Sequence, residues 1–386
     1  MLAISLLILP ILTVGCSANA SRNTSDYPVF EDLTALETAS RMGLGINIGN
    51  TLEAPDGEGS WLQPVNETYI KGLKKLGFTT VRVPCAWNSH VVDTAANMID
   101  PKWLDRVDEV IGWILKNDMF AILNIHWDGG WLETNTAKPY DVVIDKKQHD
   151  YWTQIADKLN HHDSRLLLAA MNEPWSGDDL EGAANIIKYE QTFIDAVRAT
   201  GGNNARRCLV IQAPATNIDF AIDPRYRHNL PVDSMPDKLL MEVHFYNPSD
   251  FTILCKDGEW GPGTRMRYFF GERNLVEGSE RNVLNYSEAD IAADFEKMKT
   301  HYVDHGIPVI VGEYSGTTRV IGRHQDKHEA SRSYWNEVVT REARNHGCVP
   351  CYWEAGGDIN RADGTARNQY AIDGIMRGFS TSQYLF

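Results

Sequence analysis

Residues 166–177 read LLLAAMNEPWSG, a buried-looking strand that runs directly into a polar turn. The six residues from Leu166 to Met171 are all apolar, which is typical of a strand covered on both faces in a parallel sheet. Asn172, Glu173 and Pro174 follow without a spacer. Because burying an unpaired carboxylate is costly, Glu173 is a poor choice for filling a core. We therefore expect this acid to have a chemical purpose.

Pro174 supports the same interpretation. A proline cannot donate to a sheet ladder, and it pushes the residue before it toward an extended conformation. The strand is therefore predicted to stop at the point where the side chain of Glu173 turns inward. That point is the carboxyl end of the strand.

On both sides of this stretch, between residues 43 and 380, the sequence pattern predicts short apolar strands that alternate with amphipathic helices. Asp100 and Pro101, for example, form an N-cap and first-turn pair ahead of apolar residues at helical spacing. Eight strand–helix units without a linker favour one α/β domain, a closed (β/α)8 TIM barrel, over an open doubly wound sheet with two edges to protect. The predicted strands are Gly43–Asn50, Thr79–Pro84, Phe120–His126, Leu166–Asn172, Cys208–Ala213, Leu239–Tyr246, Val309–Glu313 and Val349–Glu354. The irregular stretch from Asn247 to Asn285 is expected to be a loop over the barrel mouth.

Composition and charge narrow the classes of function. The formal net charge of the 386-residue chain is −15. A nucleic-acid partner would require a basic patch, so this charge argues against nucleic acid and against any anionic polymer as substrate. The 11 Trp and 15 Tyr residues offer flat apolar faces, which a sugar-binding cleft uses beside polar groups.

The first twenty residues are predicted to be an export signal. The apolar run Leu2–Val14 is too short to span a bilayer and suits a signal-peptide core. Ala18-Asn19-Ala20 fits ordinary signal cleavage, whereas the residues up to Cys16 resemble a bacterial lipoprotein box, in which Cys16 becomes acylated. We expect an exported monomer, secreted or attached to the cell surface or periplasmic membrane through Cys16. Residues 21–38 would form a polar tether, and residues 39–386 a single catalytic domain.

Polar residues gather at the ends of the predicted strands, where barrels of this type carry their chemistry. Glu173 follows the fourth strand and Glu313 ends the seventh. These strands lie nearly opposite in a ring of eight, so the two carboxylates can face each other across the mouth, as glycoside hydrolysis requires. A structural ion pair at the rim, such as Arg82 with one glutamate, is the alternative. The other polar strand-end residues are Asn50, Glu53, Arg82, His126, Trp127, Asn172, Gln212, His244, Tyr246, Tyr314, Trp353 and Glu354.

These residues form motifs that resemble glycoside hydrolase family 5. The motifs are NEP at 172–174, VIVGEYSG around Glu313, VRVP around Arg82, HFY at 244–246 and WE at 353–354. The segments GLGINIGNTLEAP and VHFYNPSDFT resemble its bacterial cellulase branch, and the likeness spans about residues 40 to 380. It implies a retaining endo-β-1,4-glucanase acting on cellulose-like or mixed-linkage β-glucan. A β-mannanase or xyloglucanase on the same machinery remains open, as does a surface lipoprotein that binds glycans without cleaving them.

The resemblance also implies catalytic roles. Glu173 is expected to be the acid/base and Glu313 the nucleophile. Arg82 and a hydrogen bond from Tyr246 would favour the ionised form of Glu313. Glu173 has to hold a proton near neutral pH, and His244 is placed to contact and tune it.

The residues implied to contact sugar are Asn172 at the 2-hydroxyl, His126 and Trp353 around the cleaved sugar, and Asn50 and Glu53 further toward the non-reducing side. Trp127 departs from the family pattern, since many relatives carry a second His at this position. It is either a sugar platform, together with Trp131, or a packing residue. No cofactor or metal is expected, because two carboxylates and water suffice for the reaction.

Overall fold

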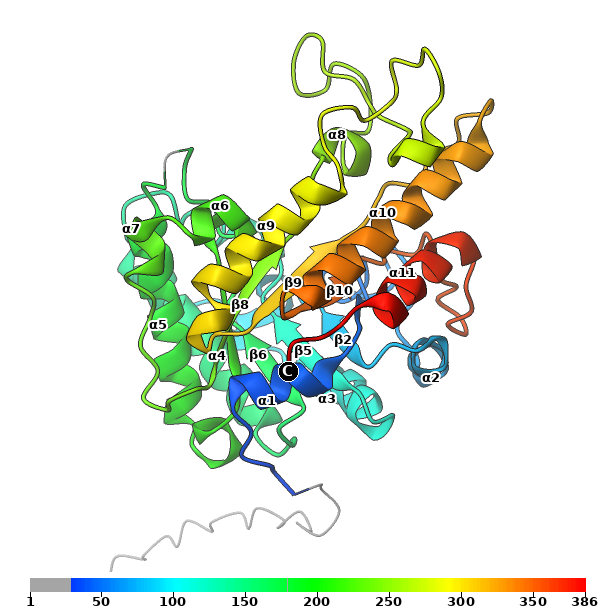
Figure 1. Ribbon diagram of the computed structural model, residues 1–386. Coiled ribbons are helices and arrows are strands. Elements are labelled where there is room, and N and C mark those ends of the chain that lie inside the picture. The colour runs from blue at the N-terminus through cyan, green and yellow to red at the C-terminus, as the bar shows by residue number, and fades with distance from the viewer. Residues whose placement is uncertain (1–28, 179) are drawn as a thin grey trace, which may run out of the picture.

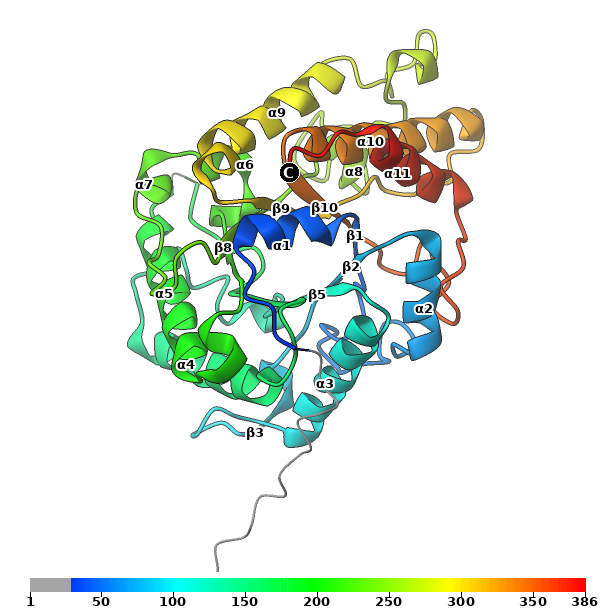
Figure 2. The ribbon, with the colours of Figure 1, turned by 60° about the horizontal axis from the view of Figure 1, so that its bottom comes forward.

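The computed structural model describes residues 29–178 and 180–386, so the expected signal and the first part of the tether lie outside the described chain. Eight parallel strands close into a barrel in the order β1-β10-β9-β8-β7-β6-β5-β2, surrounded by helices (Figures 1 and 2). The predicted (β/α)8 barrel is confirmed, and most strands are shorter than predicted. Their bounds are β1 Gly45–Asn47, β2 Thr80–Val83, β5 Phe120–Asn124, β6 Leu166–Ala169, β7 Leu209–Gln212, β8 Leu239–His244, β9 Val309–Tyr314 and β10 Cys348–Tyr352.

The helices follow local sequence signals. The Asp100 carboxylate caps α3 by accepting the N–H of Lys102, with Pro101 in the first turn, as expected. A small antiparallel pair, β3 (Val91–Asp93) with β4 (Met98–Ile99), was not predicted. Within the described residues, no helix combines the length and apolarity needed to cross a bilayer. The helices of the outer layer are α2 Glu67–Leu76, α3 Pro101–Lys116, α4 Val142–Leu159, α5 Ala183–Ala199, α6 Ile218–Ala221, α7 Pro224–Arg227, α9 Glu288–His301, α10 Gln325–Asn345 and α11 Gln369–Thr381.

Helix α1 (Ala35–Met42) lies across the amino-terminal end of the barrel (Figure 2). Thr34 and Glu37 form a reciprocal capping box at its start. Ala39 and Met42 pack against the apolar residues in the lower part of the barrel interior. The expectation that residues 21–38 form a polar tether is therefore wrong for its last four residues, because they belong to this capped, half-buried helix.

The barrel interior changes from apolar to polar toward the carboxyl ends of the strands. On β8, Leu240 belongs to the lower apolar cluster, whereas Glu242 and His244, on the same face at two-residue intervals, lie above it and are buried. Arg82 on β2 and Gln212 on β7 are also fully buried in this upper layer. Buried polar groups need hydrogen-bond partners, so these residues must pair with one another. Their gathering at one end of the barrel indicates a functional site in the upper layer.

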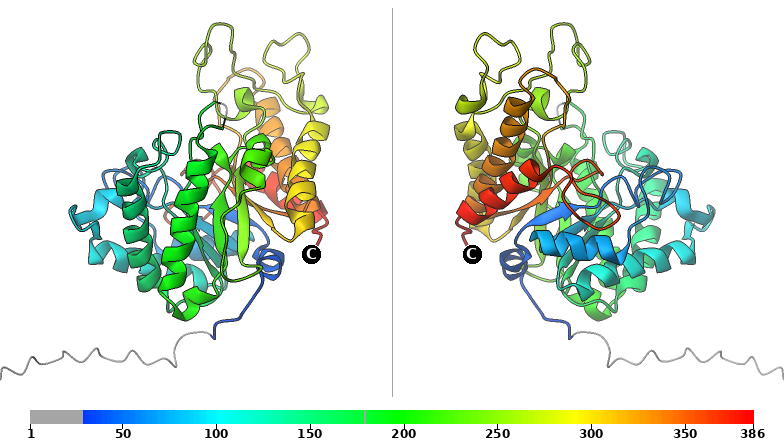
Figure 3. Two further views of the ribbon diagram at one scale, coloured as in Figure 1. Left: turned by 90° about the vertical axis from the view of Figure 1, so that its left-hand side faces the viewer. Right: turned by 90° about the vertical axis from the view of Figure 1, so that its right-hand side faces the viewer.

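The loop from Asn247 to Asn285 follows β8 and rises above the barrel mouth (Figure 3). It contains only short elements, including α8 (Ser249–Thr252), and packs its base against the barrel through Phe251 and Phe270. It is a loop over the mouth, as predicted, and forms one wall above the upper polar layer.

Candidate active site

Two glutamates face each other at the mouth of the barrel. Glu313 lies on β9 and its side chain is 8% exposed, while Glu173 follows β6 and its side chain is 46% exposed. One carboxylate oxygen of each, together with a ring nitrogen of His244, lies within 4.8 Å of the others. This distance suits the ~5 Å separation of a retaining glycosidase and is shorter than the ~6.5–9.5 Å of an inverting one. The structure thus places the two predicted residues in the expected arrangement.

The turn after β6 explains why the acid stands at the mouth. The backbone N–H of Glu173 donates to Oε1 of Glu133 at 3.0 Å. Pro174 has no N–H to satisfy, and its carbonyl accepts the N–H of Ala215 at 2.7 Å. The turn is therefore fixed by hydrogen bonds to neighbouring segments, and its side chain is left to point across the mouth. The buried strand, Glu173 and Pro174 together therefore place one carboxylate at the barrel mouth.

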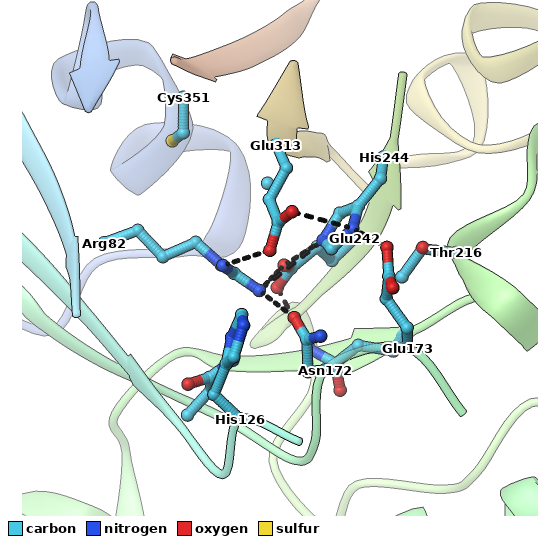
Figure 4. Close-up of polar contacts among 12 residues, drawn as sticks. Arg82, His126, Asn172, Glu173, Thr216, Glu242, His244, Glu313 and Cys351 are labelled. Carbon is cyan, nitrogen blue, oxygen red and sulfur yellow. Dashed lines mark hydrogen bonds and ion pairs between the residues drawn. The ribbon is translucent and has the colours of Figure 1, made fainter. Parts of the chain in front are cut away.

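Arg82 connects the residues of the upper layer and is fully buried (Figure 4). Its Nη1 donates to Glu313 Oε1 at 3.0 Å and to Asn47 Oδ1 at 2.9 Å. Its Nη2 donates to Asn172 Oδ1 at 2.8 Å and lies 2.7 Å from Glu242 Oε1. Because the guanidinium is planar and rigid, these contacts fix Glu313 and Asn172 relative to each other.

Besides Asn47, the sequence reasoning missed Glu242 in this cluster. It is fully buried, and it contacts Arg82 at 2.7 Å, Nε2 of His244 at 3.2 Å and the amide of Gln212 at 3.0 Å. Gly312 makes room for it, since a Cβ there would lie 2.1 Å from Glu242 Oε1. The two-residue period of the strand LLMEVH puts Glu242 on the same face as His244, and that pattern was the available signal.

His244 lies between two carboxylates of the site. Its Nδ1 lies 2.7 Å from Glu173 Oε1 and its Nε2 3.2 Å from Glu242 Oε1. Burial alone would lower the pKa of His244, but Glu313, Glu173 and Glu242 outweigh burial and raise it to about 10. For Glu173, burial raises the pKa, yet the contact with His244 and the charge of Arg82 bring it below its ordinary value.

The expectation that Glu173 itself holds the proton near neutral pH stays a prediction. Nδ1 of His244 and Oε1 of Glu173 lie 2.7 Å apart, so a proton held between them is one transfer away from either group. The two groups titrate as a pair, and it is the pair that holds the acid proton.

Tyr246 and two positive charges surround Glu313. Burial raises the pKa of Glu313, and the charges of His244 and Arg82 oppose this rise. The Tyr246 hydroxyl donates to Glu313 Oε2 at 2.9 Å. Burial keeps the pKa of Tyr246 well above its ordinary value, so this hydroxyl is always a donor. The predicted hydrogen bond from Tyr246 to Glu313 is present.

His126 and Trp353 form a stacked pair beside the carboxylates, with ring centroids 5.5 Å apart and planes 8° from parallel. Burial keeps the pKa of His126 well below its ordinary value, so the ring is neutral. The Trp353 ring lies against Gly49, where a Cβ would come within 2.9 Å of it. A flat face beside an uncharged imidazole is suited to a sugar ring, in line with the predicted subsite.

Asn50 and Glu53 differ from each other in their placement. Glu53 is 6% exposed, and its carboxylate accepts the backbone N–H groups of Asn50 and Thr51. Burial raises the pKa of Glu53 to about 7. Glu53 therefore holds the turn, while Asn50, at φ 58° and partly exposed, is the residue that the turn presents. Sugar contact stays a prediction for both residues.

Trp127 lies at the rim and is 52% exposed, with a backbone φ of 46° that is unfavourable for a bulky residue. The backbone N–H of Trp127 donates to Glu133 Oε1 at 3.2 Å, so buried Glu133 holds this turn as well as that of Glu173. Trp131 instead donates its indole N–H to Asp128 and packs under Lys147. Of the two tryptophans, only Trp127 therefore remains a candidate platform for a sugar ring. Glu133 has no periodic sequence signal that would have revealed it.

Comparisons with known proteins agree with this geometry. The family model described as cellulase (glycosyl hydrolase family 5) matches residues 46–358. A xyloglucan-specific endo-β-1,4-glucanase of Bacteroides ovatus is 32% identical over 92% of this chain and 72% of its own length. An endoglucanase A of Paenibacillus barcinonensis is 28% identical over 90% of each chain.

Solved structures show the same relationship. The structure of XEG5B, a xyloglucan-specific β-1,4-glucanase from a ruminal metagenomic library, superposes with a TM-score of 0.83. It is 32% identical and covers 92% of this chain and 98% of its own. With the family model matching most of the chain and the paired carboxylates in place, the chain belongs to the cellulase family, glycoside hydrolase family 5.

Proposed function

We propose that the protein is a retaining endo-β-1,4-glucanase that cleaves internal bonds of a β-glucan by double displacement. The observation that carries this proposal is the approach of Glu173 and Glu313 to within 4.8 Å, with Arg82 fixing one of them. A pair at this distance leaves room for one sugar carbon between nucleophile and acid, and too little for a water molecule on the opposite face.

In the first step, a carboxylate oxygen of Glu313 attacks the anomeric carbon and the bond to the leaving sugar breaks. The proton shared by His244 and Glu173 passes to the departing oxygen through Glu173, which is the more exposed of the two. Arg82 and Tyr246 hold Glu313 in line for attack. Asn172, fixed by Arg82, is available to the 2-hydroxyl, where a hydrogen bond strengthens as positive charge develops on the ring.

In the second step, Glu173 is a carboxylate and accepts a proton from water as the water oxygen attacks the anomeric carbon. The ester bond to Glu313 breaks, and the electron pair returns to its carboxylate. Two inversions give a product with the configuration of the substrate. His244, 2.7 Å from Glu173, then shares the recovered proton and restores the starting state.

Among the β-glucans, we propose xyloglucan as the substrate that the enzyme hydrolyses with the highest kcat/KM. Both the Bacteroides ovatus relative and XEG5B are named as xyloglucan-specific, each at 32% identity. Reducing-sugar release from xyloglucan, barley β-glucan, carboxymethylcellulose and β-mannan, with product lengths recorded, tests this choice. The highest kcat/KM should be on xyloglucan; a preference for β-mannan would contradict it.

Two conservative variants test whether the protein is an enzyme or a glycan-binding protein without activity. Glu173→Gln and Glu313→Gln should each lose at least a thousandfold in kcat on polysaccharide while the affinity for glucan oligosaccharides is kept. Wild-type protein that binds glucan without releasing reducing ends would refute the proposal.

Export is part of the proposal and is supported by the apolar run and the two processing motifs within residues 1–20. The mature N-terminus, determined by mass spectrometry of the protein from its native host, distinguishes cleavage after Ala20 from acylation at Cys16. Detergent-dependent release that is lost in Cys16→Ser would support anchoring. Retention of the full chain in the cytoplasm would contradict export.

A further inference from the structure

Two histidines and an aspartate form a cluster outside the active site. His161 and His162 lie just after α4, and Asp108 lies in the middle of α3, the helix that packs beside α4. One side-chain ligand atom of each residue lies within 4.8 Å of those of the other two. Among the described residues, the only other group of this kind is the one that the active-site glutamates form with their histidine.

The cluster lies at the opposite end of β6 from the reacting groups. His161 and His162 precede this strand (Leu166–Ala169), whereas Glu173 follows it. A substrate at the barrel mouth therefore does not contact the cluster. Whatever the cluster binds has no part in the proposed reaction, so an inference about it goes beyond the proposed function and does not depend on it.

The hydrogen bonding of His161 turns a lone pair toward Asp108. Nδ1 of His161 lies 3.2 Å from the carbonyl oxygen of Lys158, and because a carbonyl can only accept, Nδ1 is the donor. In the neutral ring, Nε2 is then an acceptor, and it lies 3.3 Å from Oδ1 of Asp108, which is also an acceptor. A cation between the two atoms removes their repulsion. Donation of the second ring N–H to a backbone carbonyl is the usual arrangement of a metal-binding histidine.

The distances in the cluster suit a tetrahedral ion. Zn²⁺ binds His nitrogen and carboxylate oxygen at about 2.0–2.1 Å, so two donors of a tetrahedral site lie about 3.3 Å apart. The contact of His161 with Asp108 already has this length. Nε2 of His162 lies 2.7 Å from the same oxygen and has to move away by roughly half an ångström. The ring proton of His162 then lies on Nδ1, so binding changes the tautomer without loss of a proton.

The turn that carries the two histidines is held in place by neighbouring residues. The fully buried Arg207 donates to the carbonyl oxygen of His162 at 2.8 Å, and Nδ2 of Asn203 donates to the same oxygen at 3.1 Å. Nζ of Lys158 lies 3.4 Å from Oδ2 of Asp108, which leaves Oδ1 to the two rings. The charge of Lys158 lowers the affinity for a cation, whereas the fixed turn reduces the entropy lost on binding.

We propose that Asp108, His161 and His162 bind one Zn²⁺ ion, which links α3 to the turn after α4. Two imidazoles and one carboxylate suit Zn²⁺, whereas Ca²⁺ and Mg²⁺ prefer oxygen ligands alone. Water completes the coordination of the ion. The ion is structural, and hydrolysis by two carboxylates does not require it.

The test uses the full chain after treatment with a chelator and dialysis. Calorimetric titration with ZnCl₂ near neutral pH should show one ion bound per chain. Zn²⁺ at a hundred times its Kd should raise the melting temperature by about 3 °C, and Ca²⁺ at the same concentration should not. Glu173→Gln, which removes one ligand from the active-site group, should bind Zn²⁺ as the wild type does.

His161→Gln is the main variant, because this side chain is 22% exposed and its replacement leaves the core intact. It should weaken Zn²⁺ binding at least tenfold and abolish the shift in melting temperature, and Asp108→Asn should do the same. His149→Gln is the matched control. His149 lies on α4 with Nδ1 3.5 Å from Asp150, outside the cluster, so this variant should keep both effects.

Three results would overturn the metal site. The first is wild-type protein that shows no saturable Zn²⁺ binding. The second is Zn²⁺ binding that His161→Gln leaves intact; if Glu173→Gln abolishes it, the ion lies in the active site instead. The third is an equal loss in His149→Gln, since exposed histidines in general would then account for the binding. Hydrolysis of xyloglucan by chelator-treated protein is measured separately, so the proposed function stands or fails on its own.

Discussion

Glu242→Gln removes one buried negative charge from the cluster and leaves its shape almost unchanged. Oε1 of Glu242 lies 3.2 Å from Nε2 of His244. At an effective dielectric constant of about 20, two unit charges at this distance interact by about 5 kcal/mol, equivalent to about four pKa units. Removing a carboxylate disfavours the charged imidazolium, so the pKa of His244, about 10 in the intact cluster, should fall toward neutrality or below.

The assay is kcat/KM on xyloglucan polymer from pH 4 to pH 10, since its sugar leaving group needs the acid proton and this parameter reports the free enzyme. The alkaline limb marks loss of the proton shared by Glu173 and His244, so in the variant it should move down by several pH units. At pH 8 the variant should retain about a hundredth of its pH 5 activity, whereas the wild type retains most of its own.

Glu190→Gln is the control for this experiment. Glu190 is also fully buried, but its carboxylate accepts hydrogen bonds from the Gln212 N–H and the Tyr226 hydroxyl, so its replacement removes no hydrogen-bond partner of His244. An alkaline limb that stays at the wild-type position in Glu242→Gln would refute the view that Glu242 keeps the proton on the pair. The same displacement in Glu190→Gln would refute it equally, because the effect would then come from loss of packing.

Four further outcomes follow from the geometry. Glu173→Ala should lose polysaccharide activity at least a thousandfold but retain much of its rate on dinitrophenyl glycosides, whose leaving groups need no proton; equal losses on both would remove Glu173 from the acid role. Glu313→Ala should be inactive and partly rescued by azide, giving the α-glycosyl azide; a β-product would deny Glu313 the nucleophile role. Gly312→Ala, whose Cβ would meet the Glu242 carboxylate at 2.1 Å, should lose activity at least tenfold and about 1–3 kcal/mol of unfolding free energy; near wild-type values would contradict the close packing. Asp358→Ala strands the buried Arg332, which it contacts at 2.6 Å, and should cost about 3–5 kcal/mol in urea unfolding; a cost below about 1 kcal/mol would show that the pair is not buried in solution.

The barrel was predictable because its strands are short apolar runs at regular intervals, and the site because parallel strands bring their carboxyl ends together. That rule places Arg82, Glu173 and Glu313 at one mouth although they are far apart in the sequence. The contact of His244 with Glu173 follows from the same rule, and the 2.7 Å distance bears it out.

Residues whose roles depend on tertiary neighbours could not be found in this way. Glu133 acts by accepting two backbone N–H groups from different segments, and nothing in its local sequence indicates them. The first four residues of helix α1 were assigned to the tether, and the packing of the helix against the barrel is a tertiary contact that its local sequence does not show. The raised pKa of His244 could not be predicted either, since Glu313, Glu173 and Glu242 raise it together and Glu242 was not recognised as a neighbour.

The stereochemistry of hydrolysis tests the central claim most directly. Proton NMR of the first product formed from a defined glucan or xyloglucan oligosaccharide, recorded before mutarotation, reports the configuration at the new reducing end. Carboxylates within 4.8 Å of each other predict that the β-anomer appears first and converts slowly to the equilibrium mixture. Initial formation of the α-anomer would mean single displacement by water, and would contradict the assignment of Glu313 as nucleophile.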